Sequence, residues 1–392
     1  MFSERQARMA EVGGDETKAS KLCNTRSLRI AQLAPLYERI PPHLYGGTER
    51  VVSYLTEELV GRGHDVTLFG SGDSLTAAKL VCGSPQSLRL AGLSTAGPSL
   101  HLPMLADIYE NAQQFDILHS HLDYWCFPFT RLTSTPTLVT MHGRLDLDTP
   151  TSIYDRFRHV PLVSISEAQR KPLPQMNWLG TAYHGLPADL LEFNPNPGKY
   201  LAFLGRICPE KRVDIAIDVA LRAGIPLKIA AKVDEVDQDY FETLIKPKLC
   251  PPDVELIGEI NEGEKTEFLG NAIALLFTID WPEPFGLAII ESFACGTPVI
   301  TRPVGSVPEI VKDGRTGFLG ESVEELVVAV KRVDSISRAD CRAEFENRFT
   351  VTHMAERYEQ LYGILLGEKS QIHPERSAIF RGSPTVIQVA ND

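Results

Sequence analysis

The segment LRIAQLAPLYERIPPHLYGGTERVVSYLTEELVGRGHDVTLFG, residues 28–70, contains the unit that decides the fold. A short apolar strand starts at Leu28, and a loop rich in proline and glycine follows it. A helix then opens at Thr48 and ends at Gly61 or Gly63, and HDVTLFGSG is a second strand. A strand, a helix and a strand in this order form a βαβ unit, which implies a parallel sheet with right-handed crossovers.

The same unit recurs along both halves of the chain. In the first half, three more segments have the composition of buried strands: FDILHSH (115–121), TPTLVTMHG (135–143) and VPLVSIS (160–166). A last strand near Thr181 leads into HGLPADLLEFNPNPGK (184–199), which has the composition of a linker. The second half alternates predicted strands and helices from KYLAFLGRI (199–207) to ESVEELVVAVKRV (321–333).

This order predicts an α/β protein of two doubly wound, Rossmann-like domains whose parallel sheets face each other across a cleft. Ligands of such open sheets bind at the carboxyl ends of the strands, so the cleft should hold the active site. The expected parts are a flexible extension at 1–27, a first domain at 28–195, a second at 196–350, a terminal helix at 351–367 that packs back toward the first domain, and a loose tail at 368–392.

Composition excludes several classes of protein. The 392 residues are 43% hydrophobic and 23% charged, which is ordinary for a soluble chain, and the net charge of −12 without a basic patch argues against a nucleic-acid partner. The seven cysteines are scattered and form no C-x-x-C pair, so we expect buried thiols. Since no apolar run approaches the ~18–20 residues of a spanning helix and residues 1–21 lack a signal-peptide core, we expect a cytoplasmic protein.

The segment WPEPFGLAIIESFACGTP (281–298) places a carboxylate on each side of a helix start. The prolines that flank Glu283 keep it in a loop, and Gly286 frees the backbone to turn into the helix that carries Glu291. The unpaired N–H groups at such a helix start suit a phosphate, and a carboxylate within the helix can accept hydrogen bonds from ribose hydroxyls. A loop acid followed by a solvated helix would show the same pattern.

Three further segments follow predicted strands at the same cleft edge. In GRICPEK (205–211), Arg206 and Lys211 can neutralise a diphosphate as it leaves, although an exposed loop explains such cations equally well. Gly46 and Gly47 remove side chains where the first loop meets its helix, as a plain turn also would. In MHG (141–143), His142 ends a strand, where it could donate a hydrogen bond to a ligand or be satisfied by the backbone.

The four segments GGTER (46–50), MHG (141–143), GRICPEK (205–211) and EPFGLAIIE (283–291) together resemble the retaining glycosyltransferases of family 4, the group 1 transferases of GT-B fold. The resemblance covers roughly residues 28–366. It implies an acceptor-side first domain and a second domain that binds a nucleotide sugar.

The resemblance also implies roles for individual residues. Glu283 would contact the transferred sugar and flank the reaction centre together with His142, Arg206 and Lys211, and Glu291 would bind the ribose. The implied contacts with the diphosphate and the sugar come from Gly46, Gly47, Arg206, Lys211, Phe285, Gly286 and Leu287, and those around the base from Glu259 and Ile260. The loop VGSVPEIV (304–311) departs from the family's Gly-Gly-Val-Pro by Ser306, which weakens any contact assigned to it.

Two patterns in the first half allow competing interpretations. His119 and His121, at i and i+2 of a strand, point to one face and could be two metal ligands, but a third ligand is missing from the local pattern. A loop that lines the acceptor side is the favoured interpretation. The aromatic segment LDYWCFPF (122–129) could stack on an acceptor sugar, although core packing is the commoner role for such residues.

The sequence therefore predicts a retaining glycosyltransferase that moves a hexose from a nucleotide-diphosphate sugar to an acceptor hydroxyl, without a metal or other cofactor. The expected partners are the donor and a sugar or glycan acceptor, while peripheral membrane contact and the oligomeric state stay open. The alternatives are a sugar phosphorylase or hydrolase on the same fold, and a non-catalytic nucleotide-sugar-binding protein.

Overall fold

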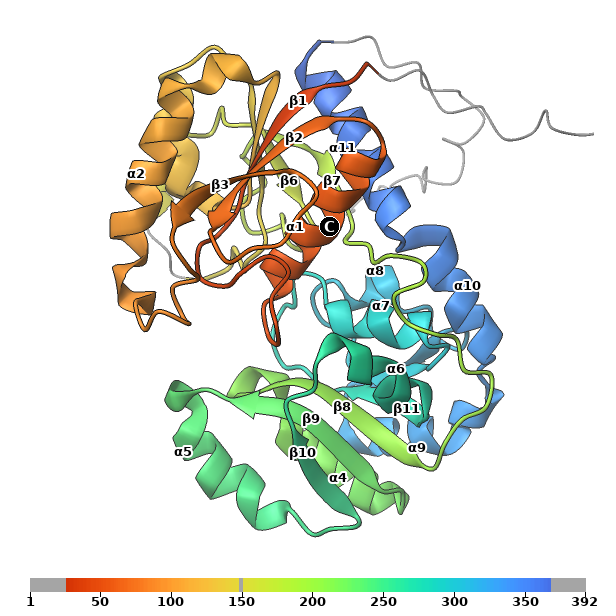
Figure 1. Cartoon of the computed structure of the whole chain (residues 1–392). Helices are drawn as coiled ribbons and strands as arrows, with labels where there is room; N and C mark the ends of the chain where they lie inside the picture. The colour runs from red at the N-terminus through yellow and green to blue at the C-terminus, as the bar shows by residue number, and fades with distance from the viewer. Residues whose placement is uncertain (1–25, 148–150, 368–392) are drawn as a thin grey trace, which may run out of the picture.

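A computed structural model describes residues 26–147 and 151–367, which form two lobes joined side by side (Figure 1). The expected extension at 1–27, except for its last two residues, and the expected tail at 368–392 lie outside the described residues. Each lobe is built on one sheet in which every pair of neighbouring strands is parallel. The predicted α/β fold of two Rossmann-like domains is confirmed.

The first sheet has the strand order β3-β2-β1-β4-β5-β6-β7. Its strands are β1 Arg29–Leu33, β2 Asp65–Ser71, β3 Lys79–Ser84, β4 Ile117–Ser120, β5 Thr137–Thr140, β6 Leu162–Ser164 and β7 Trp178–Thr181. Its helices are α1 Gly47–Gly61, α2 Gly97–Glu110 and α3 Thr151–Arg156, and the 3-10 turns of Asp123–Arg131 follow β4.

The second sheet has the order β10-β9-β8-β11-β12-β13. Its strands are β8 Tyr200–Ile207, β9 Leu227–Val233, β10 Val254–Gly258, β11 Ala272–Phe277, β12 Val299–Thr301 and β13 Gly317–Leu319. Its helices are α4 Val213–Ala223, α5 Gln238–Tyr240, α6 Glu262–Gly270, α7 Leu287–Ala294, α8 Val307–Ile310, α9 Val323–Arg332 and α10 Arg338–Arg348. The last helix of the described chain is α11 Val351–Leu365.

Several elements were missed by the sequence analysis. Helix α2 carries Pro98 in its first turn and Pro103 inside, and proline opposes a helix interior, so its pattern gave no helix signal. Helix α10 is too polar to show an apolar period, and β3 and β13 are short edge strands of their sheets. The helix expected at 237–249 keeps only one α-helical turn before it widens into a π-helix at Phe241–Ile245 and closes in a 3-10 turn that contains Pro247.

Alternate residues of the first sheet face two separate cores. On one face, Ile30, Ile117 and Leu138 pack in a cluster that includes apolar residues of α1 and α11. On the other face, Ala31 and Leu118 pack with apolar residues of α2 and the turns after β4. A period of two along each strand produces this division, because successive side chains point to opposite faces of a sheet.

In the second domain, the guanidinium of Arg338 is buried and has no carboxylate partner. It donates hydrogen bonds to the carbonyl oxygens of Asn194, Gly270 and Ala272 at 2.7–2.9 Å and to the Thr297 hydroxyl at 2.7 Å. Hydrogen bonds from each of its three nitrogens offset the burial of this cation, and they tie the linker, β11 and the segment after α7 to α10.

Helix α11 returns from the second domain and packs against α1 and β7 of the first, along the right side of Figure 1. Its Glu359 pairs with Arg62 at 2.7 Å and lies 3.1 Å from His64 Nε2. Burial opposes ionisation of this carboxyl group, but the hydrogen bonds from His64 and Arg62 outweigh burial and lower the pKa of Glu359 to about 2. The ion pair therefore fastens the end of the chain to the first domain.

Because the pKa of Glu359 is lowered from 4.5, its stabilisation is present above pH 4.5 and is lost as the pH falls toward 2. We expect Glu359→Gln to reduce the free energy of unfolding at pH 7 by on the order of 2 kcal/mol and to differ less from the unchanged chain at pH 3. Denaturant unfolding at both pH values measures this, with the exposed Glu356→Gln on the same helix as the control. Equal destabilisation at both pH values would contradict the assignment.

Candidate active site

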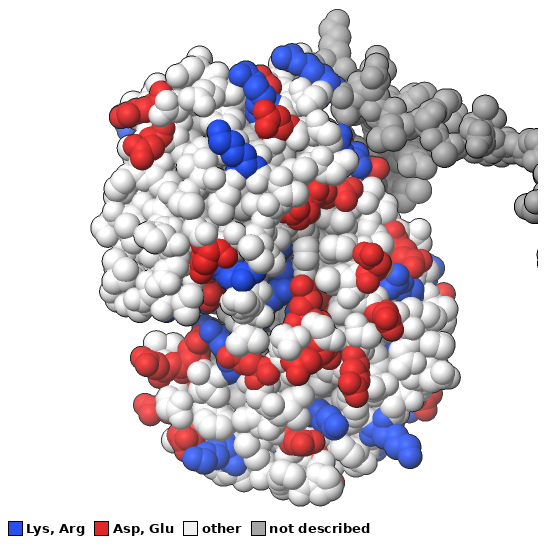
Figure 2. Space-filling model, viewed as in Figure 1, with Lys and Arg blue, Asp and Glu red and all other residues white. Residues whose placement is uncertain are grey.

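A cavity of about 580 Å³ lies between the two domains, at the carboxyl ends of both sheets. Figure 2 shows it as a hollow between the lobes, with basic side chains inside and acidic ones nearby. The cavity wall contains every site residue that the sequence predicted: Gly46, Gly47, His142, Arg206, Lys211, Glu259, Ile260, Glu283, Phe285, Gly286, Leu287 and Glu291. Segments that are far apart in the chain thus meet at one place, as expected for parallel sheets of this topology.

Glu283 and Lys211 form an ion pair in the cavity wall. The Lys211 Nζ lies 2.5 Å from Glu283 Oε2, and Trp281 Nε1 donates to the same oxygen at 2.8 Å. The ammonium group also lies over the rings of Phe277 and Trp281, 5.3 and 5.1 Å from their centroids. The carboxylate and the aromatic faces compensate the partly buried cation and fix its position.

Arg206, at the end of β8, is paired with acids of the loop that follows the neighbouring strand β9. Its guanidinium lies 3.3 Å from Asp234 and 3.5 Å from Asp237. A third cation, Lys232, lines the cavity beside it, pairs with Asp234 at 2.8 Å and lies 4.6 Å from the ring centroid of Tyr45. The sequence analysis missed Lys232, because a lysine that ends a strand carries no distinctive local pattern.

Glu291 lies on α7, and its side chain is only 5% exposed. Lys265 of α6 pairs with it at 2.5 Å and also lines the cavity. The helix begins after Gly286, whose φ of +89° is one that other residues rarely adopt. The carboxylate predicted to bind ribose is therefore held by a lysine that is distant in sequence and that the sequence analysis did not identify.

The glycines of the first loop have different surroundings. A side chain at Gly46 would collide with Pro42, and its φ of +151° also favours glycine. A side chain at Gly47 would meet only Leu287 of the opposite domain, at 3.5 Å, so this glycine leaves room across the cleft. Two residues further on, Glu49 lines the cavity, and burial raises its pKa to about 7. Glu49 was not among the predicted site residues.

Polar contacts connect the two domains on both sides of the cavity. Arg50 of α1 donates to Glu262 of α6 at 2.6 Å, and the Tyr54 hydroxyl bonds the same carboxylate. On the other side, Glu309 accepts hydrogen bonds from the backbone N–H groups of Glu167 and Ala168 at 2.8 and 2.7 Å. These contacts fix how the cavity walls of the first and second domains face each other.

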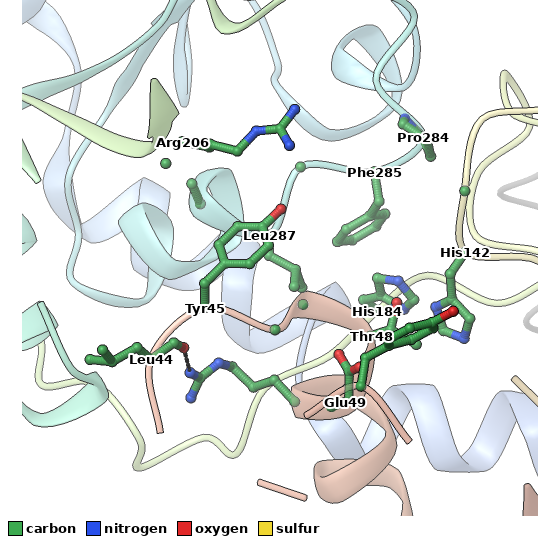
Figure 3. Close-up of a pocket in the computed structure, with 18 of the residues that line it drawn as sticks. Leu44, Tyr45, Thr48, Glu49, His142, His184, Arg206, Pro284, Phe285 and Leu287 are labelled. Atoms are coloured by element: carbon green, nitrogen blue, oxygen red, sulfur yellow. Dashed lines mark hydrogen bonds between the residues drawn. The ribbon is translucent and has the colours of Figure 1, made fainter. Parts of the chain in front are cut away.

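His142 lies at the end of β5 and forms part of a histidine cluster. Its Nε2 is 2.8 Å from His121 Nδ1, and its ring stacks on His184, with 5.3 Å between the centroids (Figure 3). Burial lowers the pKa of His142 to about 3, so the imidazole is neutral. His184, which follows β7 and packs edge-on against Phe285, was assigned to the linker by its sequence context and is an additional cavity residue.

The competing interpretations of the first half can now be compared. His119 bonds the Tyr362 hydroxyl and Thr140, and within the described ranges no group of three or more His, Cys, Asp or Glu residues could hold a metal ion. In the aromatic segment, Phe127 is fully buried in the core, whereas Trp125 lines the cavity. Core packing is thus confirmed for Phe127, whereas stacking of an aromatic ring on an acceptor sugar stays a prediction.

The loop that contains Gly305 and Ser306 lies behind Glu283 and does not line the cavity. The Ser306 N–H donates to Glu283 O at 2.9 Å, and its hydroxyl donates to Phe285 O at 2.8 Å. A side chain at Gly305, where φ is +57°, would collide with the backbone N and O of Glu283. The serine that departs from the family pattern therefore supports the loop of Glu283.

Comparisons with known proteins define the class. Residues 192–348 match the family model described as glycosyl transferases group 1, and residues 45–185 match that of glycosyltransferase family 4. HepE from Anabaena, solved in complex with UDP-glucose, aligns with a TM-score of 0.66 and 16% identity over 87% of this chain and 100% of its own. The fold is GT-B, and the chain is a glycosyltransferase.

Relatives found by sequence agree with that class. An uncharacterized glycosyltransferase of Methanocaldococcus jannaschii is 25% identical over 277 residues, which cover 64% of this chain and 77% of the relative. A D-inositol 3-phosphate glycosyltransferase of Mycobacterium leprae is 33% identical over 187 residues, which are 44% of this chain and only 39% of that enzyme. The chain belongs to the group 1 glycosyltransferases of family 4.

One prediction tests how the Glu283 loop is supported. We expect Gly305→Ala to destabilise the fold more than Gly314→Ala, because both glycines have positive φ but a side chain at Gly314 meets nothing within 4 Å. Gly314→Ala is the control and should lower the free energy of unfolding by about 1 kcal/mol, from backbone strain alone. Gly305→Ala should lower it by at least ~2 kcal/mol more. Denaturant unfolding of both variants measures the difference. Equal losses would show that Gly305 does not support the Glu283 backbone.

Proposed function

We propose that the protein transfers a hexose from a nucleotide-diphosphate sugar to an acceptor hydroxyl with retention of the anomeric configuration and without a metal ion. The observation that carries the proposal is the Lys211–Glu283 pair beside the start of α7. A leaving diphosphate would meet cations and helix N–H groups there, next to a carboxylate suited to sugar hydroxyls.

The charges in the cavity wall support this assignment. Lys211 and Arg206 are both paired with carboxylates, so a diphosphate must compete with Glu283, Asp234 and Asp237 for them. Charge that develops on the leaving oxygens strengthens their attraction for the cations, and this difference between ground and transition state lowers the barrier. The HepE complex with UDP-glucose supports a nucleotide-sugar donor by similarity of fold.

Retention is proposed to proceed by front-side attack, in which the departing phosphate takes the proton of the acceptor hydroxyl. Glu283 is held by Lys211 and Trp281, and we assign it to binding sugar hydroxyls and not to attack on the anomeric carbon. Mass spectrometry of the enzyme during turnover tests this assignment. Detection of a glycosylated side chain would contradict front-side attack and indicate a double displacement.

A panel experiment tests the function itself. UDP, GDP and ADP, each with and without an attached hexose, should be compared by thermal shift, because a bound donor stabilises the fold. The stabilising donor should then release free nucleotide faster when sugars or glycans are added, with activity unchanged by EDTA. Loss of activity in EDTA that a divalent ion restores would require a metal. Binding without nucleotide release would indicate a non-catalytic protein, and phosphate-dependent breakdown of a disaccharide a phosphorylase.

Two substitutions test the diphosphate site. Lys211→Met and Arg206→Ala should each lower kcat by roughly 10²-fold, the usual loss when one charge stabiliser of a transition state is removed. Lys199→Met, an exposed lysine at the start of the second domain, is the matched control and should leave kcat unchanged. Normal turnover in Lys211→Met or Arg206→Ala would remove that residue from the mechanism.

The ribose assignment has its own test. Glu291→Ala should weaken binding of the nucleoside diphosphate about tenfold or more, because the ribose hydroxyls lose a charged hydrogen-bond acceptor. Isothermal calorimetry with the diphosphate that stabilises the fold best measures the affinity, and Glu267→Ala on the exposed face of α6 is the control. Unchanged affinity in Glu291→Ala would contradict a ribose contact.

A further inference from the structure

A line of hydrogen bonds runs from the core of the first domain to the cavity. Gln32 of β1 is fully buried, and its Oε1 lies 2.7 Å from His121 Nε2. His121 follows β4, and its Nδ1 lies 2.8 Å from Nε2 of His142, which lines the cavity at the end of β5. The adjacent strands β1, β4 and β5 thus supply three residues that are joined by hydrogen bonds in series: Gln32, His121 and His142.

The amide oxygen of Gln32 sets the direction of donation along this series of hydrogen bonds. An amide oxygen only accepts, so in this orientation of the amide His121 Nε2 carries its proton, while Gln32 Nε2 has no hydrogen-bond partner among the described residues. A neutral imidazole has one N–H, which leaves His121 Nδ1 as an acceptor and requires His142 Nε2 to donate to it. Burial lowers the pKa of His121 well below its ordinary value, so the neutral form of both rings is the relevant one.

One consequence concerns the other nitrogen of His142. With its single N–H directed at His121, Nδ1 is left unprotonated, and it has no hydrogen-bond partner among the described residues. In Figure 3 the ring stands beside His184, at the edge of the pocket opposite Arg206. An imidazole in this state has no proton to give to a phosphate oxygen, and it can bond only to a group that donates.

We propose that Gln32 and His121 are positioning residues that hold His142 as the Nε2-protonated tautomer, so that His142 accepts a hydrogen bond from a hydroxyl of the transferred sugar. This inference rests on the proposed function and deepens it. It replaces the expectation that His142 donates a hydrogen bond to the ligand. A ligand hydroxyl would satisfy the orphaned Nδ1, whereas a deoxy sugar or a bare phosphate would not.

His119 packs beside the hydrogen-bonded series Gln32–His121–His142, here called the relay, but is not a member of it. The rings of His119 and His121 lie 4.2 Å apart between centroids, with their planes tilted by 42°. Both nitrogens of His119 are engaged, by the Tyr362 hydroxyl and by Thr140 Oγ1, each at 2.8 Å. Helix α11 therefore packs against the inner end of the relay. The tautomer of His142 depends on the Gln32 amide, and the position of the rings depends on this packing.

The ring nitrogens of the ligand-free chain provide the decisive measurement. In ¹⁵N-histidine spectra, His142 should show a protonated Nε2 and an unprotonated Nδ1, with its signals assigned by their loss in His142→Asn. In Gln32→Met the amide acceptor is gone, and we expect the two tautomers of His142 to mix, while the exposed Gln113→Met should leave the spectrum unchanged. A protonated Nδ1 in the unchanged chain would mean that the Gln32 amide has the opposite orientation, and it would overturn the proposal.

A binding experiment tests the ligand contact separately. Asparagine places an acceptor near the position of Nδ1, whereas glutamine places one near that of Nε2. His142→Asn should therefore keep the ratio of the affinities for UDP-glucose and UDP. In His142→Gln this ratio should fall about tenfold. UDP, which lacks the sugar, should bind all variants equally. An equal loss of the preference for UDP-glucose over UDP in both variants would contradict a hydrogen bond accepted by His142 Nδ1. If the unchanged chain bound neither probe, the proposed donor would be wrong, and the ring-nitrogen spectrum would still decide the relay.

Discussion

Compensation of buried charge is the constraint on which the site depends. The cavity wall holds partly buried cations, and such charges are costly unless a partner lies within contact distance. Lys211 has Glu283, Lys265 has Glu291, and Arg206 has the acids that follow β9. Because each partner comes from a different loop or helix, the pairs also set the loop positions before any ligand arrives. In the proposed function, a diphosphate would replace the carboxylates around Lys211 and Arg206 by its own oxygens, so these cations are already positioned for an anion.

The two domains contribute different chemistry to the cavity. The second domain presents paired charges and the start of α7, which suits an anionic donor. The first presents the histidine cluster, whose pKa values are lowered by burial, and Trp125, together with the charged Arg50 and Arg89. This division follows from the strand ends of each sheet, because polar loops lie in the cleft while the strands behind them are buried on both faces. Helix α11 crosses from one domain to the other and packs against the inner end of the histidine cluster through Tyr362.

Much of the fold and of the candidate site could be predicted from local patterns. Apolar strands that alternate with amphipathic helices gave the two parallel sheets, and short segments such as EPFGLAIIE identified residues that do line the cavity. The misses have a common cause. Helix α2 contains a proline, α10 has no apolar period, and Lys265, Lys232 and His184 lie in stretches without a distinctive spacing. Their importance comes from neighbours that are distant in the chain.

The sequence by itself determined the class of fold, the order of its elements and the residue types placed at the strand ends, because hydrophobic period and turn residues act over a few positions. Only the tertiary structure decided which groups meet. It paired Glu283 with Lys211 across 72 positions and joined Arg50 to Glu262 across 212. It also linked His142 through His121 to Gln32, a residue 110 positions earlier. Ion pairs and hydrogen bonds act over a few ångströms, so the partners of a side chain are set by how the sheets and helices pack and not by its place in the chain.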